Sequence, residues 1–259
     1  MKENLPVLEI DDSNIHKIVD AVYSAVGDDI LEDIQLSNLV THNSIPTRIW
    51  DKLNTNLFVA LKGSNFVTAT TKRGPWGLVV AYDSQSGFLF TFMREQRYKQ
   101  IRKDLRKRKK AHYLDALAGT FNSQLCALEG QISMFSDAKQ YEDTETIQQI
   151  VNGLIHNLNV DSTVIQNHVL VLFDSSHFEL NAIRAVMVDK NLDIVVEQEW
   201  STYIAVEESA IVETVDNPNA PANNPTQNLK LTSRASNKAS KRQNRTHIKK
   251  TEIKKENNS

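Results

Sequence analysis

Residues 57–92 read LFVALKGSNFVTATTKRGPWGLVVAYDSQSGFLFTF, and this stretch decides the predicted fold. It alternates runs rich in β-branched and aromatic residues with short polar segments that contain Gly, Pro, Asn, Asp or Ser. Runs of the first kind favour strands, and segments of the second kind favour tight turns. The four runs are Leu57–Leu61, Phe66–Thr70, Leu78–Tyr82 and Phe88–Phe92. Their hairpin spacing predicts a four-stranded antiparallel meander.

Helices are predicted on both sides of this meander. Apolar residues recur at helical spacing in 13–26 and 29–39 before it, and in about 94–128 and 142–158 after it. The second of these helices is expected to turn its apolar side chains inward, namely Ile30, Leu31, Ile34 and Leu39.

Further strands are expected near the end of the ordered part of the chain, at 169–173, 185–188, 192–197 and 202–206. The first of them, Val169–Phe173, is a continuous apolar run, which is typical of a strand buried on both faces.

The predicted fold class is therefore α+β, with N-terminal helices, the four-stranded meander, central helices, further C-terminal strands and a disordered basic tail. Residues 1–212 are expected to form one globular domain, and a division into subdomains 1–130 and 131–212 is left open. The tail is 213–259. From Asn217 onward it has no aromatic residue and three prolines. It therefore has too little apolar surface to offset the entropy of ordering.

The composition excludes several classes of protein. Among 259 residues there is one cysteine, Cys126, so an intramolecular disulfide is excluded. No apolar run approaches the roughly 20 residues that a membrane-spanning helix needs. The first residues, Met1–Asn4, lack the basic and apolar regions of a signal peptide. These features predict a cytoplasmic protein without a membrane partner.

The charge is strongly segregated along the chain. The net charge is −2, yet residues 94–110 contain ten Lys or Arg and two acidic residues, and residues 217–259 contain the same numbers. The remainder of the chain is correspondingly acidic. Because local charge governs the encounter with a polyanion, the two basic segments matter more than the net charge.

The basic segment 94–110 is predicted to form a basic helix. Its five consecutive cations, 106–110, would repel one another there, which indicates that something other than local helix stability favours them. Nucleic-acid phosphate is the expected counter-charge. Pairing with acidic groups of this chain or of a protein partner, and a plain solvated face, are the alternatives. The expected nucleic-acid-binding residues here are Arg97, Arg102, Lys103, Arg106, Lys107, Arg108, Lys109 and Lys110.

A second candidate lies in the turn 71–77, where Lys72 and Arg73 stand close to Trp76. Cations beside an aromatic ring form a platform for phosphate and base contacts. The alternative is that the tryptophan covers the sheet as an apolar cap. The chain contains no phosphate-binding motif of the Gly-x-x-x-x-Gly-Lys-[Ser/Thr] type.

No catalytic residue, metal site or cofactor is predicted. Arg106 and His112 fit an Arg-x5-His spacing similar to the motif of HEPN-type ribonucleases, but the predicted meander contradicts that all-helical family. Asp83 and Asp174 end predicted strands, where metal-dependent nucleases often place carboxylates. Asp137–Lys139 has the Asp-x-Lys form of restriction-endonuclease-like folds, in a predicted loop.

Scattered residues from Trp50 to Asp115, with Trp200-Ser201 later, carry a resemblance. They are Asn56, Arg73-Gly74, Trp76, Met93-Arg94-Glu95, Arg97 and His112-Tyr113. In these residues the chain resembles an uncharacterised family of bacterial and phage-borne proteins. The resemblance implies a bacterial, cytoplasmic, accessory-gene context and transfers no catalytic residue.

The sequence thus predicts a non-enzymatic accessory protein that binds the phosphate backbone of DNA or RNA through 94–110 and the tail. A protein-interaction or regulatory module with an acidic body is the alternative, and a nuclease is the second alternative.

Overall fold

The computed structural model describes residues 6–126 and 144–204. They lie in one compact unit, Met1–Ala205. The predicted tail, 213–259, and the Asp137–Lys139 motif lie outside the described residues.

A single six-stranded sheet forms the centre of this unit, with its strands in chain order from β1 to β6. The strands are β1 (Phe66–Arg73), β2 (Trp76–Asp83), β3 (Phe88–Arg94), β4 (Asn167–Ser176), β5 (Glu179–Val188) and β6 (Ile194–Glu199). Neighbouring strands are antiparallel except β3 and β4, which are parallel. Because parallel neighbours need a crossover connection, the chain between them can place its helices on one face of the sheet.

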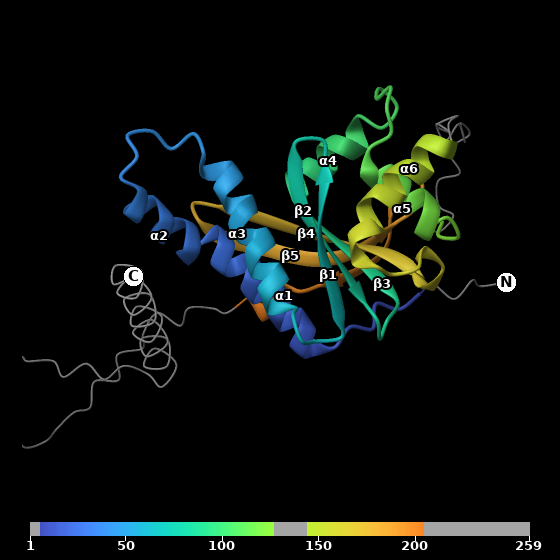
Figure 1. The fold of residues 1–259 in the computed structure, drawn as a ribbon, viewed down its shortest axis with the longest axis horizontal. Helices are drawn as coiled ribbons and strands as arrows, with labels where there is room; N and C mark the ends of the chain where they lie inside the picture. The colour runs from blue at the N-terminus through green and yellow to red at the C-terminus, as the bar shows by residue number, and fades with distance from the viewer. Residues whose placement is uncertain (1–5, 127–143, 205–259) are drawn as a thin grey trace, which may run out of the picture. The chain divides into compact units, whose positions relative to one another are not determined.

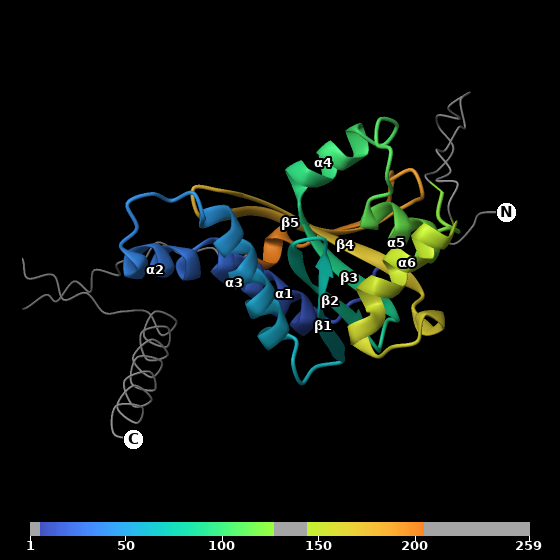
Figure 2. The same cartoon turned by 45° about the horizontal axis from the view of Figure 1, so that its top comes forward.

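Helices cover both faces of the sheet (Figures 1 and 2). They are α1 (Asp12–Val26), α2 (Asp28–Ser37), α3 (Ile45–Ala60), α4 (Glu95–Lys103), α5 (Tyr113–Phe121) and α6 (Thr144–Ile155). Side chains of α1–α3 share one hydrophobic cluster with one face of the sheet. Side chains of α4–α6 share a second cluster with the other face. The architecture is therefore a mixed α and β fold in three layers.

The central strands confirm the prediction of a strand buried on both faces. In β4, Val169, Val171 and Phe173 belong to the first cluster, whereas Leu170 and Leu172 belong to the second. Successive side chains of a strand point to opposite faces, so a continuous apolar run fills both cores.

The predicted first strand of the meander is wrong. Leu57–Leu61 ends helix α3 instead of forming a strand, so the meander has three strands, β1–β3. Ile49, Leu53 and Leu57 are buried four residues apart, whereas Val59 is exposed. This helical period over sixteen residues, with Pro46 in the first turn, outweighs the local preference of Leu-Phe-Val for strands.

The predicted long helix at about 94–128 is also corrected. It consists of α4 and α5, and residues 104–112 form a non-helical connection between them. The five cations at 106–110 therefore do not lie in a basic helix. Consecutive like charges disfavour a helix at this point, because neighbours three and four residues apart would repel.

Two smaller expectations fail at the ends of elements. In α2, Ile30 is buried, but Leu31 is exposed, as is Leu39 beyond the end of the helix. Residues Ser201–Tyr203 form a 3-10 helix where an edge strand at 202–206 was expected. The predicted helices at 13–26 and 142–158 correspond to α1 and to α6 with a following 3-10 turn, His156–Leu158.

A buried polar cluster joins the end of α5 to the sheet. The Asn122 side chain donates to the carbonyl oxygens of His168 and Val188, both at 2.9 Å, and accepts from the His168 N–H at 2.8 Å. The His168 ring lies in the same layer, with Nε2 2.8 Å from the Thr91 hydroxyl oxygen. Its Nδ1 is buried without a hydrogen-bond partner among the described residues.

His168 is expected to make stability depend on pH. Burial lowers its pKa from 6.5 to about 3, so between these two pH values the ring is protonated in the unfolded chain and neutral in the folded protein. The contribution of the neutral ring to the free energy of unfolding is complete above pH 6.5 and is lost as the pH falls toward 3. At pH 5 the loss is about 2 kcal/mol.

Urea unfolding at pH 7 and pH 5 measures this effect. The pH-dependent loss should be smaller by about 2 kcal/mol in His168→Gln than in the wild type. The exposed His42→Gln should retain the wild-type difference. An unchanged difference in His168→Gln would assign the acid sensitivity to other groups.

Candidate functional site

The tip of the β1–β2 hairpin carries one of the two predicted basic elements. Arg73 and Trp76 form the last rung of the ladder, and Lys72 and Gly77 form the rung before it. Between them Gly74 has a φ of 58°, a left-handed conformation that glycine adopts without strain. Lys72 is exposed, and 52% of the Trp76 side chain is exposed.

Arg73 attaches this tip to the beginning of α5. Its Nη1 lies 2.6 Å from Nε2 of His112, and its guanidinium carbon lies 5.3 Å from the centroid of the Tyr113 ring. A guanidinium at this distance from an aromatic ring forms a cation–π contact. The turn therefore meets the chain directly after the basic segment, at His112 and Tyr113, although the two elements are distant in sequence.

The beginning of α5 is built as a capping box. The Leu114 N–H donates to Nδ1 of His112 at 3.2 Å, and the His112 N–H donates to the Asp115 carboxylate at 2.7 Å. Arg108 forms a bidentate ion pair with the same carboxylate, through Nη1 and through Nη2 at 2.8 Å. Arg108 is thus neutralised by a buried acid, in agreement with the internal pairing considered as an alternative for this segment.

The electrostatics of this cluster keep His112 neutral. Burial, together with the charges of Arg73, Arg108 and Arg97, lowers its pKa from 6.5 to about 3. Burial also raises the pKa of Tyr113 to about 12. A general acid or base works best with a pKa near the working pH. His112 is therefore poorly suited to proton transfer at neutral pH, and its contacts are those of a helix cap.

Replacing His112 with alanine is expected to lower the free energy of unfolding by about 1–3 kcal/mol, because a cap and a ring contact are lost. His112→Asn should lose less, since asparagine also caps helices well. The salt dependence of nucleic-acid binding should stay nearly unchanged in both, because the cations of the site are retained. Thermal and urea unfolding with a parallel binding titration check this. Cleavage of RNA by the wild type that disappears in a folded His112→Ala would contradict it.

The remaining cations of the site face solvent. Arg97, Arg106, Lys107, Lys109 and Lys110 are exposed, and none of them forms an ion pair with a residue in the described ranges. We call Lys72, Arg73, Trp76, Arg97 and residues 106–113 the cationic site.

Two predicted binding residues lie on other parts of α4. Arg102 forms an ion pair with Asp193 in the turn between β5 and β6, and so faces away from Arg97. Positions five residues apart point in different directions on a helix. Lys103 is exposed in the last turn of α4.

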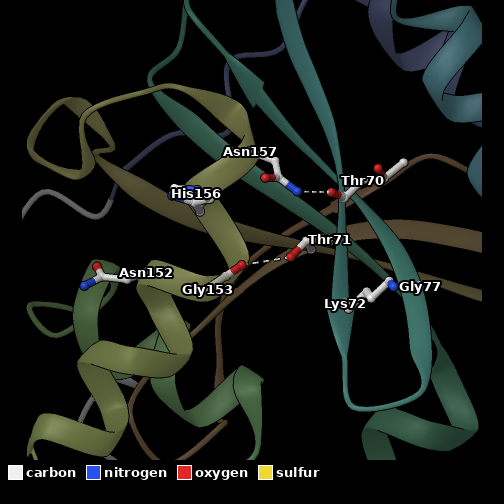
Figure 3. Close-up of a pocket in the computed structure, with 8 residues that line it drawn as sticks. All are labelled: Thr70, Thr71, Lys72, Gly77, Asn152, Gly153, His156 and Asn157. Carbon is white, nitrogen blue, oxygen red and sulfur yellow. Dashed lines mark hydrogen bonds between the residues drawn. The ribbon is translucent and has the colours of Figure 1, made fainter.

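An open groove adjoins the hairpin, between β1 and α6 (Figure 3). Its volume is about 640 Å³. The Thr71 hydroxyl donates to the Gly153 carbonyl at 2.9 Å, and the Asn157 amide donates to the Thr70 carbonyl at 2.7 Å (Figure 3). The lining residues are Thr70, Thr71, Lys72, Gly77, Asn152, Gly153, His156 and Asn157.

Sequence reasoning missed both Asp115 and this groove. The acid three residues after His112, followed by apolar residues, is a capping-box pattern that was available in the sequence. No signal in the sequence predicts the groove, because it depends on how α6 packs against β1.

The two carboxylates noted at the ends of predicted strands, Asp83 and Asp174, lie far apart. Asp83 is paired with Phe88, and Phe88 is level with Asn167, seven residues before Asp174 on β4. At about 3.3 Å per residue, the two acids lie roughly 23 Å apart along the sheet. The Asp83 carboxylate accepts hydrogen bonds within its own turn, from Gln85 and Ser86.

Within residues 6–126 and 144–204, no group of three or more His, Cys, Asp or Glu side chains is placed to hold a metal ion. None of the helices there has the length and apolar character to cross a membrane.

Comparison with known proteins identifies the family of the chain. No curated protein and no solved structure matches the chain. A family model described as a family of unknown function, DUF5986, matches residues 8–250, which is nearly the whole sequence. The chain therefore belongs to this family of unknown function, as the resemblance to an uncharacterised family predicted.

Proposed function

We propose that this protein is a non-enzymatic nucleic-acid-associated protein that binds the phosphate backbone through the cationic site. One observation carries the proposal. Two basic elements that are far apart in the sequence converge, because Arg73 at the hairpin tip contacts His112 directly after the basic connection. Neither element alone distinguishes a binding site from a solvated face, but their convergence concentrates positive charge at one place.

The charge balance of the site supports this function. Its buried carboxylate, Asp115, is already paired with Arg108. The exposed cations beside it form no ion pairs among the described residues. A polyanion would release its condensed counterions at such a surface, which is the main source of affinity in non-specific nucleic-acid binding.

We extend the proposal to the basic C-terminal segment, 217–259, which would add phosphate contacts. The cellular context that we propose is a bacterial or phage-borne accessory protein of the cytoplasm. This part of the proposal rests on the composition and on the resemblance in Arg73-Gly74, Trp76 and His112-Tyr113.

Fluorescence anisotropy with labelled DNA and RNA over a range of salt concentrations tests the proposal. We expect the logarithm of the association constant to fall linearly with the logarithm of the salt concentration. The slope should be about 0.7 to 0.9 per phosphate contact. The same mixtures, incubated with Mg²⁺ and separated on a denaturing gel, should contain uncleaved oligonucleotide. Absence of binding at low salt would refute the proposed function, and metal-dependent cleavage would favour the nuclease alternative.

One feature favours the protein-interaction alternative. Three exposed apolar side chains lie close together in sequence, Leu36 in the last turn of α2 and Leu39 and Val40 directly after the helix, and Val40 is 99% exposed. Exposed apolar groups that are contiguous often mark protein contacts. Light scattering of the wild type and of Leu36→Ser tests this reading. The protein-interaction alternative would be favoured if the wild type had a mass above that of the monomer and Leu36→Ser had the mass of the monomer.

A further inference from the structure

We propose that the cationic site takes single-stranded nucleic acid, with one base stacked on Trp76 and a neighbouring nucleotide in the groove between β1 and α6. This inference rests on the proposed function and specifies its ligand. It follows from the exposure of one aromatic ring, from the way the hairpin tip is held, and from the position of the groove.

Trp76 is placed differently from the other two tryptophans. Trp200 is fully buried, and Trp50 packs against the first hydrophobic cluster, whereas Trp76 belongs to neither cluster. The apolar-cap alternative would place its ring over the sheet, yet half of the side chain is exposed. An exposed indole ring beside cations is a stacking surface for a nucleobase.

The hairpin tip is held in place before any ligand binds. Arg73, which pairs with Trp76 across the ladder, contacts both His112 and Tyr113. The stacking surface is thus connected to a buried helix start, and not to a freely moving turn. A surface that is ordered in advance loses less conformational entropy on binding.

Cations lie close to this ring. Arg73 shares a rung of the ladder with Trp76 and so points to the same face, whereas the exposed Lys72, one rung away, points to the opposite face. The charges of Arg97 and Arg108 act on His112, which Arg73 contacts. The phosphates next to a stacked base would meet these cations.

The groove begins directly next to Trp76. Lys72 and Gly77, the rung adjacent to Arg73 and Trp76, both line it. Its volume of about 640 Å³ lies within the range of small-molecule sites, about 300–1,000 Å³. Asn157 brings an amide group to its wall, and Asn152 and His156 also line it (Figure 3). Such groups can form hydrogen bonds with base edges.

These features favour a single strand over a duplex. In a duplex the faces of the bases are stacked and their Watson–Crick edges are paired, so neither Trp76 nor the groove could use them. Unpaired bases can be turned outward, stacked on aromatic rings and bound at their edges. A site that offered only cations would not distinguish the two forms.

The test compares labelled single-stranded DNA, single-stranded RNA and the corresponding duplexes, each of about 12 nucleotides, with the full chain. We expect tighter binding of a single strand, and the DNA and RNA arms show which sugar is preferred. Trp76→Ala should weaken single-strand binding by about 5- to 150-fold, which corresponds to the range of base–aromatic stacking energies. Trp76→Phe should retain most of the affinity.

The matched control is Phe58→Ala, which removes an exposed aromatic ring from α3 on the opposite face of the sheet. It should bind as the wild type does. Thermal unfolding verifies that each variant is folded. Tryptophan fluorescence gives an independent readout, since stacking should quench the wild type on binding but not Trp76→Phe.

The outcomes separate this inference from the proposed function. Salt-sensitive binding of single strand and duplex with equal affinity, unaffected by Trp76→Ala, would overturn the inference and leave the function standing. Quenching that persists in Trp76→Phe would overturn the stacking of a base on this ring. Absence of binding to every oligonucleotide would overturn both.

Discussion

Replacing Arg106, Lys107, Lys109 and Lys110 with glutamine is expected to weaken nucleic-acid binding by up to roughly 10³-fold near physiological salt. Each phosphate contact contributes about 0.7 to 0.9 to the slope of log affinity against log salt concentration. If all four cations contact phosphate, the slope should therefore fall by about 3. All four side chains are exposed in the connection between α4 and α5.

Arg108 is left unchanged in this variant for a structural reason. It forms the ion pair with the buried Asp115, so its removal would leave that carboxylate without the guanidinium. Loss of binding in an Arg108 variant could then reflect damage to the beginning of α5. The four exposed cations have no such role, and their replacement should change the melting temperature little.

A control with matched charge separates a local effect from a change in net charge. Lys109→Gln/Lys110→Gln and Lys17→Gln/Lys62→Gln each remove two positive charges, but the second pair lies on α1 and directly after α3, outside the cationic site. The first pair should reduce the salt slope, and the second should leave it close to that of the wild type. Equal effects of both pairs would show that only the overall charge matters.

Asn122→Ala is expected to be the most destabilising single substitution of those considered. It removes the partner of three backbone groups, the N–H and C=O of His168 and the C=O of Val188. Asn122 is fully buried, so water does not replace the lost hydrogen bonds. Each buried group left unsatisfied costs about 1–3 kcal/mol, and we expect a total loss of about 3–5 kcal/mol.

Urea unfolding measures this loss, with Asn181→Ala as its control. Asn181 is exposed, and its side chain donates to the Ser176 hydroxyl at the surface. The control should change the free energy of unfolding by less than about 0.5 kcal/mol. A loss below about 1 kcal/mol in Asn122→Ala would show that the end of α5 does not need to be fastened to the sheet.

The sequence alone determined the elements whose pattern is unambiguous. The helix at 13–26 and the buried strand at 169–173 correspond to α1 and to part of β4. Both follow from the spacing of their apolar residues. A helix that packs on a core repeats them about every 3.6 residues, and a strand covered on both faces has them at consecutive positions. The two basic elements of the candidate site were also visible in the sequence, because they are clusters of charge that need no partner to be recognised.

The strand predicted at 57–61 failed because local preference and period disagreed. Leu57 lies on one buried face with Leu53 and Ile49, and only packing against α1 makes that longer period decisive. The pairing of β3 with β4 was likewise beyond local patterns. A parallel pair joins strands separated by the helices α4–α6, and no turn residue marks it.

Only the tertiary structure placed the parts of the site together. Arg73 and His112 are 39 residues apart, and Thr71 and Gly153, which contact each other beside the groove, are 82 residues apart. Only the tertiary structure shows that Arg108 pairs with Asp115. This pair distinguishes Arg108, which has a structural role, from the exposed cations beside it in the sequence. The physical reason is that a charge acquires its role from the groups within a few ångströms of it. Folding of the whole chain sets those distances, and the residues beside the charge in the sequence do not.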